Sequence, residues 1–380
     1  MITSNNEALG ILFPNSYDNL VPELVSERLM ASIPFAGRYR LVDFVLSSMA
    51  ASGIDNISLI VKKNYHSLMD HLGSGREWDL TRKNGGLNIV PPFAQKTVSV
   101  YSGRVQALAS ILPFLKGQKE KYVILSDTNL AINFDFRELL NTHIKSNADV
   151  TIVYCKTNVT QEIIDKTALS GDLYYTFDLK GNRVKGIQIN PQAPGTQNLS
   201  MNIYVLEREL LIQQINDAYV KGLTYFERDL LMPQLDTLNV QGFQYKGYLA
   251  RITSTKSYFD ENMRLLDEKN LNALFSPNPI YTKIRDDNPT RYIGKPKVAN
   301  SMMADGCVIE GEVENSILFR GVKVEKGAKV KNCILMQDTV IEAGARVENV
   351  ITDKNVMVTV GQEVRGTDSF PVYIEKGKCV

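Results

Sequence analysis

A repeat of seventeen residues runs through the C-terminal part of this chain. Residues 327–334 read Gly-Ala-Lys-Val-Lys-Asn-Cys-Ile, and residues 344–351 read Gly-Ala-Arg-Val-Glu-Asn-Val-Ile. One repeat earlier, residues 313–317 read Val-Glu-Asn-Ser-Ile and keep the same frame. A period close to three times six, with small or branched apolar residues at each inward position, is typical of a β-helix built from hexapeptide repeats. We therefore expect a left-handed β-helix in this part of the chain.

The repeat also carries an asparagine at a constant place, at Asn315, Asn332 and Asn349. Asparagine is one of the few residues with a side chain that adopts the left-handed backbone region readily. The three positions therefore predict a stacked turn, one in each coil, with a left-handed backbone. A small antiparallel sandwich is the alternative architecture, but it gives no reason for a constant offset of seventeen residues.

The N-terminal part of the chain has a different pattern, in which strand-like and helix-like runs alternate. Apolar and β-branched runs at residues 57–61, 122–126 and 150–154 predict strands. Residues 104–115 and 136–146 have the apolar spacing of amphipathic helices. This alternating order predicts a Rossmann-like α/β domain with a mostly parallel sheet that is flanked by helices.

Two proline-containing stretches separate these parts of the chain. Ser-Pro-Asn-Pro at residues 276–279 and Asn-Pro at residues 288–289 interrupt the helix and strand patterns, as a linker does. We expect a nucleotide-binding type of domain at residues 1–275, a linker at residues 276–290 and the β-helix domain at residues 291–380.

The composition narrows the class of partner. With 380 residues, of which 44% are apolar, the chain can bury a substantial core in each of two domains. Its formal charge of +1 comes from 43 basic and 42 acidic side chains without basic blocks, so we expect no nucleic-acid partner and no membrane association. The four cysteines are widely separated and form no metal-binding pattern. Together with an N-terminus that lacks the pattern of a signal peptide, they predict a cytoplasmic protein with reduced thiols.

The first predicted strand, residues 9–13, lacks the phosphate-binding loop that follows such a strand in many nucleotide-binding folds. A loop that wraps a triphosphate needs glycines, so that backbone N–H groups can approach the oxygens, and usually a cation. Here no glycine follows the strand until Gly37, and residues 1–27 contain no Lys or Arg. We therefore expect the fold of a nucleotide-binding enzyme without a functional phosphate-binding loop.

The segment that follows carries a family resemblance. Residues 28–44 read Arg-Leu-Met-Ala-Ser-Ile-Pro-Phe-Ala-Gly-Arg-Tyr-Arg-Leu-Val-Asp-Phe. This resembles the R-A-K-P-A-V-P-F-G-G-K-Y-R-I-I-D-F motif of the sugar-phosphate nucleotidyltransferase family, and most closely its ADP-glucose pyrophosphorylase branch. That branch joins a catalytic domain to a β-helix, so the resemblance extends over essentially the whole chain. It implies a reaction in which a sugar 1-phosphate attacks the α-phosphorus of ATP, assisted by Mg²⁺ and cationic side chains.

The positions that the family uses for metal binding are only partly kept. Directly after the predicted strand at residues 122–126, Asp127 matches the aspartate that holds the metal in the family. The second aspartate of the family's metal site is replaced by Arg251, which inverts the charge. One carboxylate beside a guanidinium is a poor site for Mg²⁺, because the cation needs a second anionic ligand there. We therefore expect no intact catalytic set and no metal bound by this chain, with Asp127 as the lone retained match.

The substrate pocket that the resemblance implies has also lost its cations. Asn190 stands where the family has a lysine for the sugar phosphate, and Met30 replaces the lysine of the R-A-K-P motif. Gly103 and Ser200 match substrate-binding positions, although Asn202 replaces the glycine that follows two residues after Ser200. The loss of the loop, both lysines and one metal ligand together indicates a degenerate active site.

Three arginines are clustered after the first loop, at Arg28, Arg38 and Arg40. Arg28 and Arg40 match family positions near an allosteric anion site. Guanidinium groups bind phosphates through paired hydrogen bonds, so the cluster predicts a site for a phosphorylated small-molecule effector. The alternative is that the three side chains form salt bridges that support a surface loop.

The resemblance implies a function through assembly. In that branch, a catalytic subunit is often combined with a homologous subunit whose active site is degraded. We interpret this chain as such a non-catalytic or weakly catalytic regulatory subunit of glucose-1-phosphate adenylyltransferase, in glycogen biosynthesis. It would form a heterotetramer with the catalytic homologue, which would bind Mg²⁺ and ATP, whereas this chain alone would need no cofactor.

Two other functions stay open. Asp127 could carry a metal while Arg104 or Arg251 substitutes for the missing loop cation, which would leave an active nucleotidyltransferase. Alternatively, the scaffold could bind a nucleotide-sugar without turning it over and act as a stand-alone sensor. Formation of ADP-glucose by the isolated chain would indicate the first function, and chromatography with and without the catalytic chain would test the second.

Overall fold

The computed structural model describes residues 7–82, 85–91, 103–161, 164–165 and 174–380. The chain divides into two compact units, each of which is discontinuous in sequence. The first, here called the sheet unit, comprises Met1–Leu20, Val45–Thr128 and Phe134–Gly247. The second, here called the β-helix unit, comprises Val21–Phe44, Asn129–Asn133 and Tyr248–Val380. Because these units are defined by packing, the domain boundaries expected around residues 276–290 stay a prediction.

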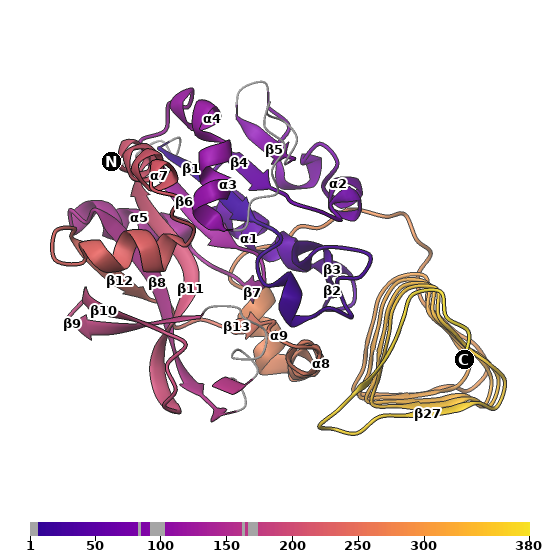
Figure 1. The fold of residues 1–380 in the computed structure, drawn as a ribbon. Helices are drawn as coiled ribbons and strands as arrows, with labels where there is room; N and C mark the ends of the chain where they lie inside the picture. Colours follow the sequence, from indigo (N-terminus) through magenta and orange to yellow (C-terminus); the bar gives the residue numbers. More distant parts are fainter. Residues whose placement is uncertain (1–6, 83–84, 92–102, 162–163, 166–173) are drawn as a thin grey trace. The chain divides into compact units, whose positions relative to one another are not determined.

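A nine-stranded sheet forms the centre of the sheet unit (Figure 1). Its strands are β1 (Ala8–Phe13), β4 (Asn56–Ile60), β5 (Gly86–Val90), β6 (Tyr122–Asp127), β8 (Val150–Val159), β9 (Tyr175–Lys180), β10 (Arg183–Ile189), β11 (Gly195–Glu207) and β12 (Val240–Gln244). Their order in the sheet is β5-β4-β1-β6-β11-β8-β12-β10-β9. Within the described residues, β10 and β11 run against the other strands, so the predicted mostly parallel sheet is confirmed.

The centre of this sheet brings two strand ends together. β1 and β6 are buried along their whole length, as their apolar sequences require. They pair in parallel, and the last pair of their register joins Phe13 to Asp127. The carboxyl ends of both strands therefore lie side by side, which is where parallel sheets usually carry their functional groups.

Helices pack on the sheet and supply the rest of its core. Leu108 of α3 (Arg104–Ser110) and Leu211 of α7 (Arg208–Val220) join the apolar cluster of the central strands. The single helix expected at residues 104–115 is instead two, α3 and α4 (Leu112–Lys116), because Pro113 lacks an N–H and begins a new helix. The other described helices that contribute to this unit are α1 (Leu41–Ala51), which has residues in both units, α2 (His66–Leu72) and α5 (Phe136–Lys145).

Three parallel sheets of five strands build the β-helix, and Figure 1 shows its coils as a triangle. The first sheet contains β14 (Arg291–Tyr292), β17 (Val308–Ile309), β20 (Lys323–Val324), β23 (Val340–Ile341) and β26 (Met357–Val358). The second contains β15 (Lys297–Ala299), β18 (Glu312–Glu314), β21 (Lys329–Lys331), β24 (Arg346–Glu348) and β27 (Glu363–Arg365). The third contains β16 (Met302–Met303), β19 (Ile317–Leu318), β22 (Ile334–Leu335), β25 (Val350–Thr352) and β28 (Val372–Ile374).

The register of these sheets confirms the predicted repeat. Val330 pairs with Val347, seventeen residues further on. The coils are not all of this length, because Val298 pairs with Val313, fifteen residues on, and Val350 pairs with Val372, twenty-two residues on. The longest interval contains a tight turn that is closed by hydrogen bonds between Thr367 and Phe370.

The asparagines of the repeat lie at the expected stacked turn. Asn315, Asn332 and Asn349 have φ values of 45°, 49° and 53°, which is the left-handed region. Asn300, one coil earlier, has a φ of 41° and belongs to the same corner. The prediction of a left-handed turn in each coil is therefore confirmed for these positions.

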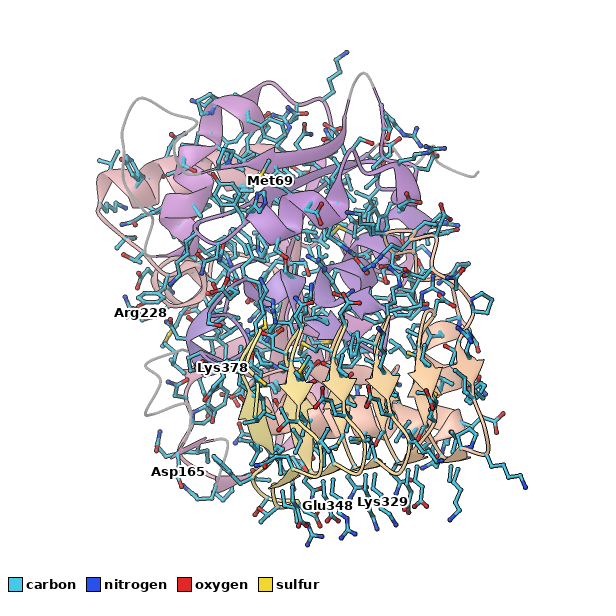
Figure 2. The ribbon with its side chains drawn as sticks, turned by 90° about the vertical axis from the view of Figure 1, so that its right-hand side faces the viewer. Met69, Asp165, Arg228, Lys329, Glu348 and Lys378 are labelled. Carbon is cyan, nitrogen blue, oxygen red and sulfur yellow. The ribbon has the colours of Figure 1, made fainter. Side chains whose placement is uncertain are left out.

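The outer face of the second sheet is charged. Figure 2 shows Lys329 and Glu348 pointing away from the coils. Glu312 lies between Lys297 and Lys329, with N–O distances of 3.1 and 3.2 Å. Such exposed pairs contribute little to stability, but they keep this face of the β-helix in water.

The N-terminal segment of the β-helix unit is anchored to the coils by a buried ion pair. Nη2 of Arg28 donates to both carboxylate oxygens of Asp353, at 2.6 and 2.8 Å. Both side chains are at most 3% exposed, and Tyr373 Oη donates to the same carboxylate at 2.7 Å. Removal of one partner from such a pair leaves a buried charge without compensation, so the interaction resists separation.

The same segment holds α8 (Thr255–Met263) in place. Tyr258 Oη donates to the carbonyl oxygen of Pro34 at 2.7 Å, and the N–H of Ala36 donates to Asn262 Oδ1 at 2.9 Å. The remaining elements of this unit include β2 (Pro34–Phe35), β3 (Tyr39–Arg40), β7 (Leu130–Ile132), β13 (Leu249–Arg251), the short helix η6 (Arg264–Leu266) and α9 (Glu268–Phe275). No helix in the described part of the chain combines the length and the apolarity that a membrane crossing needs.

We expect Arg28→Met to lower the free energy of unfolding by about 3–5 kcal/mol, because it leaves the Asp353 carboxylate buried without its counter-ion. Unfolding in guanidinium chloride, followed by circular dichroism, measures this loss. The double variant Arg28→Met/Asp353→Leu should be more stable than Arg28→Met, since it buries no unpaired charge. Strictly additive effects of the two substitutions would contradict a direct interaction.

Candidate functional site

A cavity of about 400 Å³ lies in the sheet unit, at the carboxyl ends of β1 and β6. Its lining includes Gly103 and Asp127, which sequence analysis assigned to the degenerate active site, and Arg104, which it considered as a substitute cation. Aromatic and basic side chains complete the wall, among them Phe13, Tyr17, Lys62, Lys63, Tyr175, Tyr225 and Phe226. A pocket is therefore present at these residues, and its chemistry depends on how the buried charges are paired.

Asp127 ends β6 and is fully buried. Its Oδ1 accepts from Ser16 Oγ at 2.7 Å, and its Oδ2 accepts from Asn202 Nδ2 at 2.8 Å. Arg104 Nη2 donates to both oxygens at 3.0 Å. A carboxylate offers about four lone-pair sites, so these contacts occupy the whole acceptor capacity of Asp127.

Arg104 begins α3 and pairs with a second buried carboxylate. Its Nη1 donates to Glu227, which also accepts from Tyr204 Oη at 2.7 Å. The guanidinium lies 5.0 Å from the ring centroid of Phe13 and 5.4 Å from that of Tyr204, within the range of cation–π contacts. Burial opposes the charge of Arg104, but the carboxylates of Asp127 and Glu227 outweigh burial and raise its pKa well above the usual value. The guanidinium is thus permanently charged.

A close backbone approach positions this arginine. The N–H of Val105 donates to the carbonyl oxygen of Thr224 at 3.2 Å, which brings the start of α3 against residue 224. A Cβ at Gly103 would lie 2.4 Å from that same oxygen, so any larger residue would push the two segments apart. Gly103 therefore has a structural role at the pocket wall.

The polar groups of the loop after β1 form hydrogen bonds within the loop and with the neighbouring Lys62 backbone. Asn15 Nδ2 donates to Asp18 Oδ2, and Asn15 Oδ1 accepts from the N–H of Lys62, both at 2.8 Å. The N–H groups of Asp18 and Leu20 donate to carbonyl oxygens of the same loop, at 3.5 and 3.1 Å. These donors consequently do not converge on the cavity as they would in a phosphate-binding loop.

Mg²⁺ does not fit this donor set. The ion prefers oxygen ligands in octahedral geometry, whereas Asp127 is surrounded by the donor groups of Ser16, Arg104 and Asn202. In the described residues, no group of three His, Cys, Asp or Glu side chains gathers in a way that could hold a metal. Arg104 instead places a covalently attached positive charge beside the carboxylate.

Ser200 supports the cluster from β11. Its Oγ donates to Asn202 Oδ1 at 3.1 Å and accepts from the N–H of Asn202 at 3.0 Å. These bonds orient the amide of Asn202, whose Nδ2 also donates to Tyr17 Oη at 2.6 Å. The substrate-binding role expected of Ser200 stays a prediction, and what the structure assigns to it is the orientation of Asn202.

The remaining residues of the sequence prediction lie elsewhere. Arg251 is in the β-helix unit, on β13 opposite Leu130 of β7, and the ionic partner described for Asp127 is Arg104. Sequence analysis missed Glu227, which is 4% exposed and lies in a π-helical turn, Phe226–Leu231. Residues 226–231 read Phe-Glu-Arg-Asp-Leu-Leu, so Glu227 is one of three consecutive charged residues and nothing in the sequence singles it out as buried.

The three clustered arginines do not share one partner. Arg28 is buried against Asp353. Arg38 is exposed and lies near Arg320, whose pKa is lowered by burial and then by the positive charge of Arg38. Arg28 and Arg40 both act on Lys354, which is partly buried. Burial and then the charges of Arg40 and Arg28 lower the pKa of Lys354 to about 7. The charged form of Lys354 is therefore disfavoured both by burial and by the neighbouring guanidinium groups.

The sheet, its pocket at the ends of β1 and β6, and the hexapeptide coils define a domain of the nucleotidyl transferase type that is joined to a β-helix. Residues 23–268 match the family described as nucleotidyl transferase, and residues 286–369 match the family described as GlmU-like, C-terminal hexapeptide. Both matches agree with the architecture that the repeat and the alternating pattern predicted.

Curated relatives place the chain more narrowly. It is 34% identical to the glycogen biosynthesis protein GlgD of Bacillus subtilis (strain 168), over 86% of this chain and 83% of that protein. It is 37% identical to GlgD of Geobacillus stearothermophilus, with the same coverage of 86% and 83%. It is 28% identical to the glucose-1-phosphate adenylyltransferase of Bacillus anthracis, over 87% of each. The chain belongs to the nucleotidyl transferase family, in the group of glycogen biosynthesis proteins named GlgD.

We expect Arg104→Met to lower the free energy of unfolding by about 3–5 kcal/mol, because Asp127 and Glu227 would be left buried without a counter-ion. Chemical denaturation monitored by the fluorescence of Trp78, which lies in the same unit, measures the change. Arg228→Met is the matched control, since the Arg228 side chain is 46% exposed and pairs at the surface, and we expect a change below about 1 kcal/mol. Equal losses in both variants would show that Arg104 does not balance the buried carboxylates.

The lowered pKa of Lys354 predicts a pH dependence of stability. Between about pH 7 and 10.5 the unfolded chain binds a proton at Lys354 that the folded protein does not, so stability rises with pH across this window. Lys354→Met should remove this contribution and be most stabilising, relative to the wild type, below pH 7. Unfolding at pH 6 and pH 9 measures the difference, with the exposed Lys326→Met as the control. A pH-independent effect of Lys354→Met would contradict the lowered pKa.

Proposed function

We propose that this chain is a non-catalytic regulatory subunit of glucose-1-phosphate adenylyltransferase, which forms ADP-glucose and diphosphate from ATP and glucose 1-phosphate in glycogen biosynthesis. It acts in the cytoplasm, in a heterotetramer with a homologous catalytic chain. The observation that carries this proposal is the ion pair between Arg104 and Asp127 in the pocket. The names of the relatives, which include both GlgD proteins and glucose-1-phosphate adenylyltransferases, agree with it.

The chemistry of the reaction supports the absence of turnover. Nucleotidyl transfer needs a divalent cation and further positive groups on the transferring phosphate. Here the carboxylate that would hold the metal is saturated, and the loop after β1 directs its N–H groups inward. Mg²⁺ and ATP would accordingly be bound by the catalytic partner.

The alternative of an active enzyme with a substitute arginine is less well supported. Arg104 lies in the pocket, but Asp127 and Glu227 already neutralise its charge. A guanidinium held by two carboxylates has little charge left for a triphosphate, and displacing it would expose both acids. The stand-alone sensor keeps the same scaffold and differs only in needing no catalytic chain.

Regulation in this proposal acts through an anion site on the β-helix unit. Arg40 and Lys354 place positive charge beside the Arg28–Asp353 ion pair, and Arg38 adds an exposed guanidinium nearby in sequence. A phosphorylated small-molecule effector would relieve this repulsion and favour one state of the complex. The effect on the catalytic partner would then follow from a shift between two arrangements of the assembly.

The proposal predicts that ADP-glucose formation depends on combining this chain with the catalytic homologue. Purified alone, this chain should form ADP-glucose at the background rate, whereas co-expression with the catalytic homologue should give a mixed tetramer with at least severalfold higher turnover or an altered effector response. Coupled detection of diphosphate measures the rate, and size-exclusion chromatography with light scattering measures the mass. The catalytic homologue alone is the control. Turnover by the isolated chain would overturn the regulatory role, and failure to co-purify would leave the stand-alone sensor as the better description.

A further inference from the structure

A second cavity, about 370 Å³ in volume, lies within the β-helix unit. One wall is the asparagine corner of the coils, formed by Asn300, Asn315, Asn332 and Asn349. The other wall comes from α8 and η6, with Lys256, Phe259, Asp260, Met263 and Leu266, and Asp368 also lines the cavity. The hydrogen bonds of Tyr258 and Asn262 to residues 34 and 36 fix α8, so this groove has a firm wall on each side.

The asparagines do more than allow a left-handed turn. Another corner of the same coils uses glycine, at Gly327, Gly344 and Gly361, with φ values of 71–76°. Glycine adopts this conformation without strain, so a turn alone does not require a carboxamide. Four successive coils nevertheless place a carboxamide on the wall of the groove.

The stacked asparagine side chains of this corner do not satisfy all their hydrogen-bonding groups among themselves. Asn300 Nδ2 donates to Asn315 Oδ1 at 2.7 Å. The side chain of Asn332 makes no hydrogen bond to any residue that the structure describes. Asn349 is 7% exposed, and its buried Oδ1 has no partner among those residues. The carboxamide of Asn332, which is partly exposed, is therefore available on this wall of the groove to form hydrogen bonds with a polar ligand.

The charges of the groove favour a neutral ligand. Lys256 and Asp260 form an ion pair with each other, so neither presents a free charge. Asp368 adds one negative charge to the described lining, which disfavours phosphates and carboxylates. Carboxamides supply a donor and an acceptor in one plane, which matches neighbouring hydroxyl groups. The apolar wall of Phe259, Met263 and Leu266 suits a ligand with one apolar face.

We propose that this groove binds a neutral oligosaccharide, and specifically a linear α-1,4-glucan. Sugar rings combine paired hydroxyl groups with an apolar face of C–H bonds, and coils spaced by about 4.8 Å present the amides at regular intervals to a repeating chain. The choice of an α-glucan among neutral oligosaccharides rests on the proposed function, because glycogen is the polymer that ADP-glucose serves. The subunit would thereby hold the complex near the chain ends of glycogen, where the glucose of ADP-glucose is used.

Isothermal titration calorimetry of the full chain with maltoheptaose tests this inference. We expect saturable binding that Asn315→Gly/Asn332→Gly weakens about tenfold or more, since two carboxamide contacts are lost. Glycine keeps the left-handed turns, so the variant should fold as the wild type does, which circular dichroism checks. The matched control is Asn355→Gly, because Asn355 has a φ of 57° and is exposed outside the groove.

Three outcomes would overturn the inference: no saturable binding by the wild type, equal binding by all three proteins, or equal affinity for cellohexaose, which has β linkages. The titration uses the chain without its catalytic partner, so it is independent of ADP-glucose synthesis. A chain that binds maltoheptaose and yet fails to assemble or regulate would overturn the proposed function alone, whereas normal regulation without glucan binding would overturn the groove alone.

Discussion

Charge can be buried inside a protein only where opposite charge is buried beside it, and the sheet unit meets this condition at Arg104. Its guanidinium joins the start of α3 to the end of β6 through Asp127, and to the π-helical turn through Glu227. The loop after β1 and the middle of β11 reach the same carboxylate through Ser16 and Asn202. Five segments that are separated in sequence thus meet at the ion pair of Arg104 and Asp127, which is part of the core.

The β-helix unit follows the same rule with different residues. Arg28 and Asp353 form a buried pair that ties an early segment of the chain to a late coil. Around this pair, Lys354 is held among positive charges and loses much of its affinity for a proton. The unit therefore contains both a fixed ion pair and a responsive basic group, next to each other in sequence. One maintains the fold, and the other can change its charge near neutral pH.

Local features of the fold could be predicted from the sequence, because they depend on period and on single residue types. The seventeen-residue offset predicted the β-helix, the repeated asparagines predicted its left-handed corner, and Asp127 was placed at the end of a strand. The partner of Arg104 could not be predicted in this way, since Glu227 is 123 residues away and no periodicity links the two. The break between α3 and α4 could have been predicted from the sequence, because Pro113 lacks the N–H that a residue inside a helix donates.

The unequal lengths of the coils in the β-helix have a consequence for how the sequence of such a chain can evolve. Neighbouring strands remain in register whether the coil between them takes fifteen, seventeen or twenty-two residues. Extra residues collect in a turn such as the one closed by Thr367 and Phe370, where Phe370 is 76% exposed. Insertions at a corner therefore add surface without disturbing the apolar interior. A solenoid of this kind can gain or lose recognition loops independently of its fold, so homologous subunits can diverge in what they contact while their coils remain superimposable.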